Sequence, residues 1–358
     1  MFIWLYEWLM QDVPILHVFY PLIMRNVMAG LTALVLSLWM GPYLIRYLSA
    51  KQTGQPIRHD GPQSHLSKAG TPTMGGILIL MTMMVAILLW GELKNPYLWL
   101  LISVTAGIGL IGWIDDYKKL IKKNSKGLAG RWKYFFQSLI AILTLMGLWI
   151  ISKGTPNTLS IPFTSFVLSL GSMYYLLAYF VIVGTSNAVN LTDGLDGLAI
   201  VPVALVATGL GFIAYFSGSP FWASHWSLTH LSYSGELSLF CSALVGSSLG
   251  FLWFNAYPAK LFMGDVGALA LGAALGTLGV MIHQELILFI MGGLFVIETL
   301  SVILQVYSFK LTGKRLFLMS PIHHHFELKG WPENRVIVRF WIMTLLCVVI
   351  GFLSLHFK

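Results

Sequence analysis

The chain has 358 residues, of which 57% are hydrophobic and only 10% are charged. A soluble globular domain carries about 25% charged residues, so this composition excludes an ordinary water-exposed surface. A membrane-spanning helix needs about 20 apolar residues, and we predict an all-α polytopic membrane protein with about ten transmembrane helices in a single domain, residues 1–358. The net charge of +8 is typical of basic loops held on one side of a membrane and does not indicate a nucleic-acid partner.

The predicted elements begin with an aromatic stretch, MFIWLYEWLM, which we expect at the membrane interface and not as a cleaved signal peptide. Apolar runs long enough to span a membrane then recur along the chain. They cover residues 22–46, 74–91, 97–114, 134–152, 172–185, 196–216, 237–254, 266–282, 285–309 and 336–357. Cys241 and Cys347 lie inside such runs and are expected to be small buried hydrophobic side chains.

The basic residues predict the orientation of these runs. All but four of the 22 Lys and Arg residues lie in loops on one side of the predicted bundle. The other side holds Arg25, Lys94, Lys153 and Lys358. The positive-inside rule makes the basic side cytoplasmic and places both termini on the outer, periplasmic side.

An adjacent acidic pair, Asp115 and Asp116, ends the third apolar run directly before a lysine-rich loop. Neighbouring carboxylates repel each other unless a cation compensates, and Mg²⁺ takes one or two carboxylates together with substrate phosphates. A solvated helix end that pairs with nearby lysines would explain the pair equally well. The pair alone therefore leaves both interpretations open.

The segment NLTDGLDG, which begins at Asn190, is more specific. Asn190, Asp193 and Asp196 are spaced i, i+3, i+6 and would share one face of a helix, while Gly194 and Gly197 would let the backbone approach a ligand. A polar turn with Asx caps is the alternative. Two acids and an amide without a basic neighbour favour a functional role.

The segment FMGDVG places Asp265 between glycines, just before a run of small residues. A carboxylate is favourable near a helix N-terminus without any further role, so helix capping competes with metal binding here. Phe262 is either an interfacial aromatic residue or a stacking surface for a flat ring.

Three consecutive histidines, His323, His324 and His325, lie in the last loop on the basic side. Three adjacent residues cannot all face one way, so we do not expect a zinc site from this run alone. Imidazoles can instead donate to phosphate or ribose oxygens. Together with Mg²⁺, the acids and lysines on this side suit phosphoryl transfer, whereas the absence of a P-loop pattern argues against an ATPase of that type.

Eight segments resemble the polyprenyl-phosphate N-acetylhexosamine-1-phosphate transferases, and the resemblance covers essentially the whole chain. They are GTPTMGG at 70–76, DDYKK at 115–119, RWKYF at 131–135, NAVNLTDGLDGLA at 187–199, FLWFNAYPA at 251–259, FMGDVG at 262–267, ETLSVILQV at 298–306 and PIHHHFELKGWPE at 321–333. The last segment is similar to the branch that uses a muramoyl-pentapeptide donor.

The resemblance implies a Mg²⁺-dependent homodimer in the bacterial inner membrane, with ten helices and an active site on the cytoplasmic face. The implied reaction moves phospho-MurNAc-pentapeptide from UDP-MurNAc-pentapeptide to undecaprenyl phosphate, giving lipid I and UMP in peptidoglycan biosynthesis.

The motif matches also imply roles for individual residues. The catalytic set would be Asp115, Asp116, Asp265, Asn190, Asp193 and Lys133. The substrate-binding set would be Lys68, Thr73, Gly194, Leu195, Asp196, Asn255, Phe262, His323, His324 and His325. Asp265 would ligate Mg²⁺, and Asp115 and Asp116 are further candidate ligands. Uracil would stack on Phe262, and Lys133 would meet a phosphate.

Two other functions compete with this one. A sister transferase that uses UDP-GlcNAc would share the acidic motifs but is disfavoured by the histidine segment. A secondary transporter would concentrate polar residues at the bilayer midplane. Only Glu298 lies plainly that deep, and we expect it to be a buried structural acid near Ser301 or Gln305.

Overall fold

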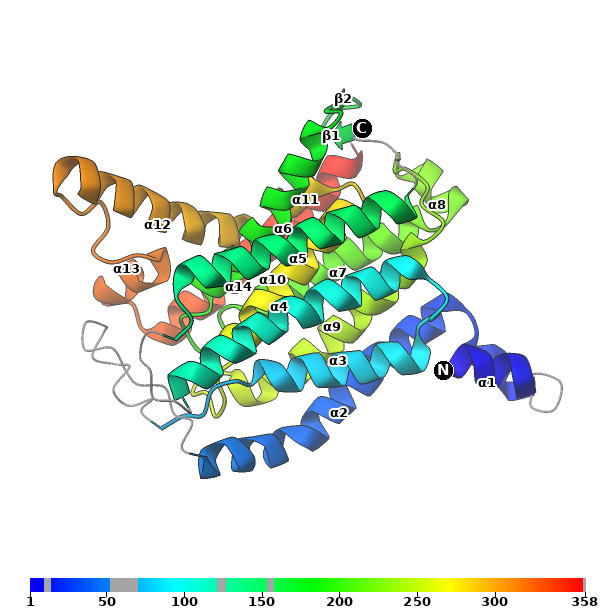
Figure 1. Ribbon diagram of the computed structural model, residues 1–358, viewed down its shortest axis with the longest axis horizontal. Coiled ribbons are helices and arrows are strands. Elements are labelled where there is room, and N and C mark those ends of the chain that lie inside the picture. The colour runs from blue at the N-terminus through cyan, green and yellow to red at the C-terminus, as the bar shows by residue number, and fades with distance from the viewer. Residues whose placement is uncertain (10–13, 52–69, 121–126, 153–157, 357–358) are drawn as a thin grey trace.

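The computed structural model describes residues 1–9, 14–51, 70–120, 127–152 and 158–356, and this part of the chain is almost entirely helical (Figure 1). The helices are α1 (Phe2–Leu9), α2 (Leu22–Ala50), α3 (Gly76–Trp90), α4 (Pro96–Leu120), α5 (Gly130–Ile151), α6 (Met173–Thr192), α7 (Ile200–Ser217), α8 (Pro220–His225), α9 (Ser234–Asn255), α10 (Gly264–Met281), α11 (Glu285–Met291), α12 (Gly293–Thr312), α13 (Ile322–Leu328) and α14 (Glu333–His356), with a 3₁₀ turn at Pro14–Phe19. A two-stranded antiparallel hairpin, β1 (Thr158–Ser160) and β2 (Val167–Ser169), is the one sheet among these residues.

The predicted membrane architecture is confirmed. Within the described residues, nine helices are long and apolar enough to cross a membrane: α2, α4, α5, α6, α7, α9, α10, α12 and α14. The predicted run 74–91 forms α3, whose 15 residues fall short of the about 20 that a perpendicular span needs. The orientation of the termini stays a prediction.

The ninth predicted run, 285–309, is two helices and not one. α11 ends at Met291, and α12 begins at Gly293 after a break at Gly292. Two consecutive glycines carry no side chains that would hold a continuous helix in place, so the chain can change direction here. Figure 1 shows α12 leaving the bundle at its left-hand side, toward α13.

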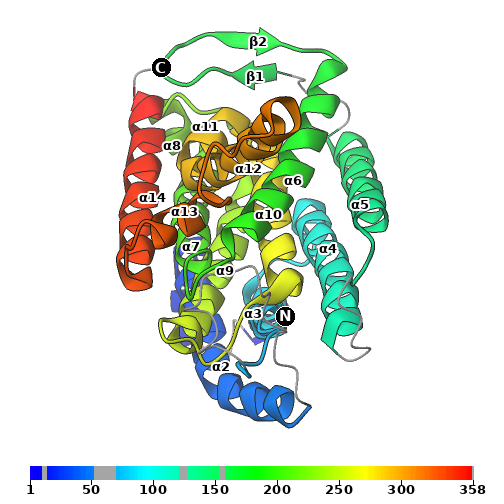
Figure 2. The ribbon, with the colours of Figure 1, turned by 90° about the vertical axis from the view of Figure 1, so that its left-hand side faces the viewer.

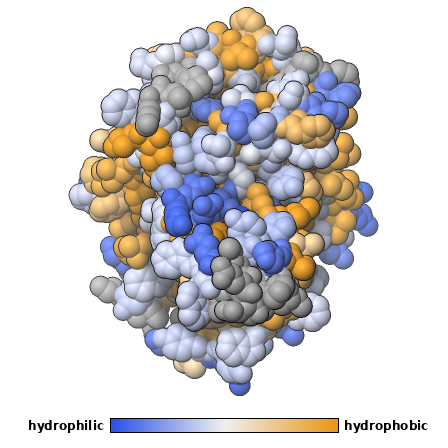
Figure 3. All heavy atoms as spheres, turned by 90° about the vertical axis from the view of Figure 1, so that its right-hand side faces the viewer, coloured by the Kyte–Doolittle hydropathy of each residue, from blue (hydrophilic) through white to orange (hydrophobic). Residues whose placement is uncertain are grey.

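α10 lies at the centre of the bundle, with 94% of its apolar window buried inside the protein. It packs chiefly against α4 and α6, which lie beside it in Figure 2, and it also contacts α3, α7 and α11. By contrast, α2, α5 and α12 bury less than a third of theirs and present apolar faces that a bilayer would cover. Figure 3 looks onto the side that carries α1 and α8, where hydrophilic residues gather near the middle and hydrophobic ones flank them.

Candidate active site

Three carboxylates from two helices meet at one end of the bundle. Asp115 and Asp116 lie near the end of α4, and Asp265 lies in the first turn of α10. One oxygen from each can be chosen so that all three lie within 4.8 Å of one another. Asp115 and Asp116 are buried, and the Asp265 side chain is 17% exposed. The arrangement offers a compact, all-oxygen ligand set of the kind that Mg²⁺ prefers.

Two lysines bridge two of these carboxylates. Lys119 Nζ lies 2.6 Å from Asp115 Oδ2 and 3.2 Å from Asp265 Oδ2. Lys133 Nζ lies 3.1 Å from Asp115 Oδ2 and 2.6 Å from Asp265 Oδ2. Three acids against two ammonium groups leave excess negative charge, which a divalent cation would neutralise. Lys119 was not among the predicted site residues, although its i,i+4 spacing from Asp115 was a signal for it.

Backbone amides complete the surroundings of the α4 acids. Leu128 N donates to Asp115 Oδ1 at 2.6 Å, and Val266 N donates to Asp116 Oδ2 at 3.2 Å. The second contact sets Asp116 against the N-terminal turn of α10, where negative charge is favourable. Among the described residues, the Asp115 carboxylate therefore faces two lysines and one backbone amide, whereas the Asp116 carboxylate accepts from one backbone amide.

Thr73 lies beside this cluster, as its predicted place in the site requires. The segment before α3 pairs with the segment before α10, since Phe262 N donates to Pro72 O at 2.9 Å. Gly264 adopts a positive φ of 75°, and a Cβ there would lie 2.6 Å from Asp116 Oδ2 and 2.9 Å from Thr73 Oγ1. The Thr73 hydroxyl is buried and has no hydrogen-bond partner among the described residues. Phe262 itself is half-buried.

The NLTDGLDG segment is not one helix, so the condition under which its polar residues would share a single helical face is not met. α6 ends at Thr192, Asp193 is its C-cap, and the chain turns through Gly197 at a φ of 72°. Asn190 is thus helical, whereas Asp196 belongs to the turn. Burial raises the pKa of Asp193 to about 7, and the negative charges of Asp265 and Asp196 act in the same direction.

Two predicted substrate residues hold this turn in place. Asp196 Oδ2 accepts a hydrogen bond from Ala259 N at 2.9 Å, and Asn255 Oδ1 accepts one from Gly197 N at 3.0 Å. Both side chains are buried. Leu195 is also buried, in a small hydrophobic cluster that joins the turn to α12 and α14. In this structure Asp196 and Asn255 stabilise the turn by hydrogen bonds, and Leu195 stabilises it by apolar packing.

The three histidines have three different environments. His323 is completely buried, with Nδ1 donating to Glu298 Oε1 at 3.1 Å, and a Cβ on Gly194 would lie 2.3 Å from its Nε2. His323 therefore packs directly under the turn. His324 Nδ1 lies 2.8 Å from Glu327 Oε2. His325 Nδ1 accepts a hydrogen bond from Leu318 N, in the loop before α13, at 3.1 Å.

Glu298 is buried, as predicted, but its side chain contacts His323 and not Ser301 or Gln305. The Ser301 hydroxyl donates to the backbone carbonyl of Glu298 at 2.7 Å. The Gln305 side-chain amide donates to the backbone carbonyl of Phe317 at 3.0 Å. Lys68 lies outside the described residues.

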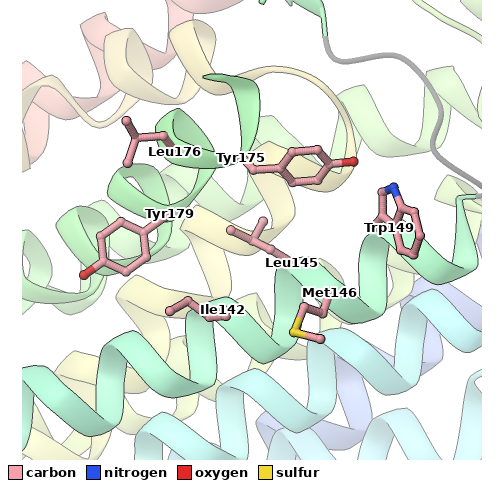
Figure 4. Close-up of a pocket in the computed structure, with 7 residues that line it drawn as sticks. All are labelled: Ile142, Leu145, Met146, Trp149, Tyr175, Leu176 and Tyr179. Carbon is pink, nitrogen blue, oxygen red and sulfur yellow. The ribbon is translucent and has the colours of Figure 1, made fainter. Parts of the chain in front are cut away.

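An apolar groove runs between α5 and α6, away from the charged cluster (Figure 4). Its volume is about 540 Å³, and its walls come from both helices. It is lined by Ile142, Leu145, Met146, Trp149, Tyr175, Leu176 and Tyr179. Along α5 it begins nine residues after Lys133, which is about 14 Å of helix.

Comparison with known families gives two matches. The sequence model of glycosyl transferase family 4 matches residues 98–283, more than half of the chain. Phospho-N-acetylmuramoyl-pentapeptide-transferase signature 1 matches residues 68–80. The first match contains all three clustered carboxylates, and the second contains Thr73.

Proposed function

The chain belongs to glycosyl transferase family 4, and we propose that it transfers phospho-MurNAc-pentapeptide from UDP-MurNAc-pentapeptide to undecaprenyl phosphate, giving lipid I and UMP. The observation that carries the proposal is the cluster of Asp115, Asp116 and Asp265 with its two lysines. Its charge and its place at the end of a membrane bundle suit a reaction between a soluble pyrophosphate and a lipid phosphate.

Mg²⁺ is the cofactor that the donor set supports. Asp265 would hold it together with Asp115 and Asp116, because the three supply buried oxygen ligands within one coordination sphere. When bound, the ion would neutralise charge on the phosphate oxygens. Lys119 and Lys133 already lie against the same carboxylates and are placed to bind those phosphate oxygens.

The two α4 acids differ in how far they are neutralised, and this difference supports separate roles. Asp115 is held by two lysines and one amide, so it anchors the cations of the site. Asp116 has the single amide of Val266, so it is the better acceptor for a proton from the acceptor phosphate. A bond then forms from an acceptor oxygen to the sugar-bearing phosphorus, and the bridging oxygen leaves with UMP.

The groove between α5 and α6 supports a lipid-linked acceptor (Figure 4). Hydrocarbon surrounds this part of the bundle, so an open apolar groove there is filled by a hydrocarbon chain and not by water. The prenyl chain of undecaprenyl phosphate would lie in it, with its phosphate toward Lys133.

The nucleotide would lie on the other side of the acids. Half-buried Phe262 would stack on uracil, and Thr73 and Asp193 would lie beside the bound nucleotide. With this function, the charged end of the bundle would face the cytoplasm, at the inner membrane of a bacterium. A homodimer is part of the same proposal.

The test is an assay of purified protein in detergent with undecaprenyl phosphate and Mg²⁺, in which UMP release is measured with each of two donors. We expect UMP with UDP-MurNAc-pentapeptide and none with UDP-GlcNAc. Chelation should stop the reaction, and excess Mg²⁺ should restore it. Release with UDP-GlcNAc alone would assign the chain to the sister reaction, and no release with either donor would refute the proposal.

A further inference from the structure

A hydrogen-bonded amide pair, of which Gln137 is buried and Asn187 half-buried, joins α5 to α6 one helical turn from Lys133. Gln137 is 1% exposed, and its Oε1 accepts a hydrogen bond from Asn187 Nδ2 at 3.1 Å. Its Nε2 is buried and has no hydrogen-bond partner among the described residues. Such orphaned donors are uncommon, because a buried N–H that lacks an acceptor destabilises the folded protein.

The orientation of the Gln137 amide is fixed by its neighbours. Asn187 Nδ2 also donates to the backbone carbonyl of Val183 at 2.8 Å. A carbonyl oxygen can only accept, so the amide nitrogen of Asn187, and not its oxygen, faces this side. Gln137 must then present its own oxygen to Asn187. Its Nε2 is consequently directed away from Asn187, and exchanging the two atoms would cost the existing bond.

The amide lies between the polar and the apolar parts of the same two helices. Gln137 follows Lys133 by one turn of α5, and Asn187 precedes Asn190 by one turn of α6. Lys133 Nζ bridges Asp115 and Asp265. The apolar groove lies on the same two helices, toward the C-terminal end of α5 and the N-terminal end of α6 (Figure 4). Along α5, Gln137 therefore lies between the lysine that bridges the acids and the first residue of the groove, where the phosphate and the chain of a lipid-anchored phosphate would join.

We propose that Gln137 Nε2 donates a hydrogen bond to a phosphate oxygen of the lipid-linked acceptor, and that Asn187 holds the amide in the orientation that this bond needs. The inference rests on the proposed function, since it names the substrate group that this amide binds. The acceptor phosphate satisfies a donor that the protein leaves unpaired, and its negative charge strengthens the bond. The amide thus recognises the acceptor, while the acids and lysines carry the charge.

The test replaces Gln137 with methionine, which has a similar length and no donor. We expect Gln137→Met to raise KM for undecaprenyl phosphate by about tenfold or more, as loss of a hydrogen bond to a charged group does, with KM for the nucleotide donor unchanged. The thermal midpoint of the substrate-free protein should stay near that of wild type, because the variant removes one unpaired N–H but leaves Asn187 Nδ2 without its acceptor on Gln137.

A second variant at the same position tests the hydrogen bond in case Gln137→Met does not fold. Gln137→Glu keeps an oxygen toward Asn187 but replaces the donor with a negatively charged group, so it should raise KM for the acceptor further. Thr144→Val is the matched control, since Thr144 is buried on the same helix and its hydroxyl donates only to the Ile140 carbonyl. It should change neither KM.

The possible outcomes separate this inference from the proposed function. If wild type releases UMP and Gln137→Met leaves KM for the acceptor unchanged, the amide has no substrate role. An equal rise in both KM values with a lower thermal midpoint would show a structural role and overturn the inference. A rise only for the nucleotide donor would overturn the assignment to the acceptor. If wild type releases no UMP at all, the proposed function itself has failed.

Discussion

Two ends of the bundle each bury acidic and basic side chains, but they differ in how completely the charges are paired. At the end near α1, Arg25 and Glu236 form a bidentate pair, with Nη2 to Oε1 at 2.6 Å and Nη1 to Oε2 at 3.1 Å. Arg25 also donates to the carbonyls of Trp90 and Tyr20, and Glu236 accepts from the Glu92 amide. One cation meets one anion there, and both are surrounded by further hydrogen bonds.

The other end has more acid than base and leaves donors without acceptors. Asp115, Asp116 and Asp265 face two lysines, and Thr73 Oγ1 and Gln137 Nε2 have no partners among the described residues. A fully paired ion pair such as Arg25 with Glu236 fixes helices relative to one another, whereas a cluster with more carboxylates than cations is suited to a cationic ligand. The comparison predicts that changes at one end affect stability and changes at the other affect turnover.

The largest effect is expected for Asp265→Asn. The change removes a candidate ligand of Mg²⁺ and should lower turnover by about a thousandfold or more, since charge stabilisation by a metal supplies several kcal/mol. The thermal midpoint should stay the same or rise, because one of three clustered carboxylates no longer repels the others. UMP release and thermal unfolding of the same preparation provide the two measurements.

The matched change at the opposite end is Glu236→Gln, which should lower the thermal midpoint and leave turnover per folded molecule near that of wild type. If Asp265→Asn kept near-normal turnover, Asp265 would not belong to the metal site. The predicted contrast between the two ends would then fail.

The next effect in size is the loss of stability in Arg25→Ala. Removing one partner of a buried ion pair leaves Glu236 uncompensated and costs about 3–5 kcal/mol. We expect a thermal midpoint about 5 °C or more below that of wild type in detergent. Lys94→Ala is the control at the same end: Lys94 pairs with Glu7 at 3.7 Å, both side chains are more than half exposed, and the midpoint should barely change. Equal shifts in the two variants would contradict the role of Arg25 as a clamp.

Sequence was sufficient where a single property decides the outcome. Hydropathy alone predicts the spans, because a membrane helix must be apolar over its whole length. The acidic pair and Asp265 were candidates from the sequence, but a solvated helix end and helix capping explained them as well until the fold brought the three carboxylates together. The break at Gly292 was not predicted, since the run remains apolar on both sides of the glycine and hydropathy does not report direction.

Sequence was insufficient where a partner comes from far along the chain. Glu298 was correctly expected to be buried, but its contact with His323 depends on how α13 packs under the turn at Gly194. The second lysine, Lys119, was missed because the sequence from Lys118 to Lys133 holds many basic residues, and only the fold shows which of them meet Asp265. The orphaned Gln137 donor is likewise invisible in a sequence, since it is defined by what its neighbours do not provide.

The smallest effect, a pH dependence, would sharpen the contrast at the acid-rich end. The pKa of Asp193 is raised from its ordinary value of 3.8 to about 7. Between these two values the folded protein binds more protons than the unfolded chain, so stability falls as pH rises from about 4 to about 7.

Asp193→Asn abolishes that loss. In the presence of a chelator its thermal midpoint should match that of wild type near about pH 4 and exceed it near about pH 8. Asn190→Ala, which alters a neighbouring side chain that does not titrate, should differ from wild type by the same amount at both pH values. If Asp193→Asn also differed from wild type by the same amount at both pH values, Asp193 would already be charged in the folded protein at low pH. The acid-rich end would then hold less uncompensated negative charge than its geometry indicates.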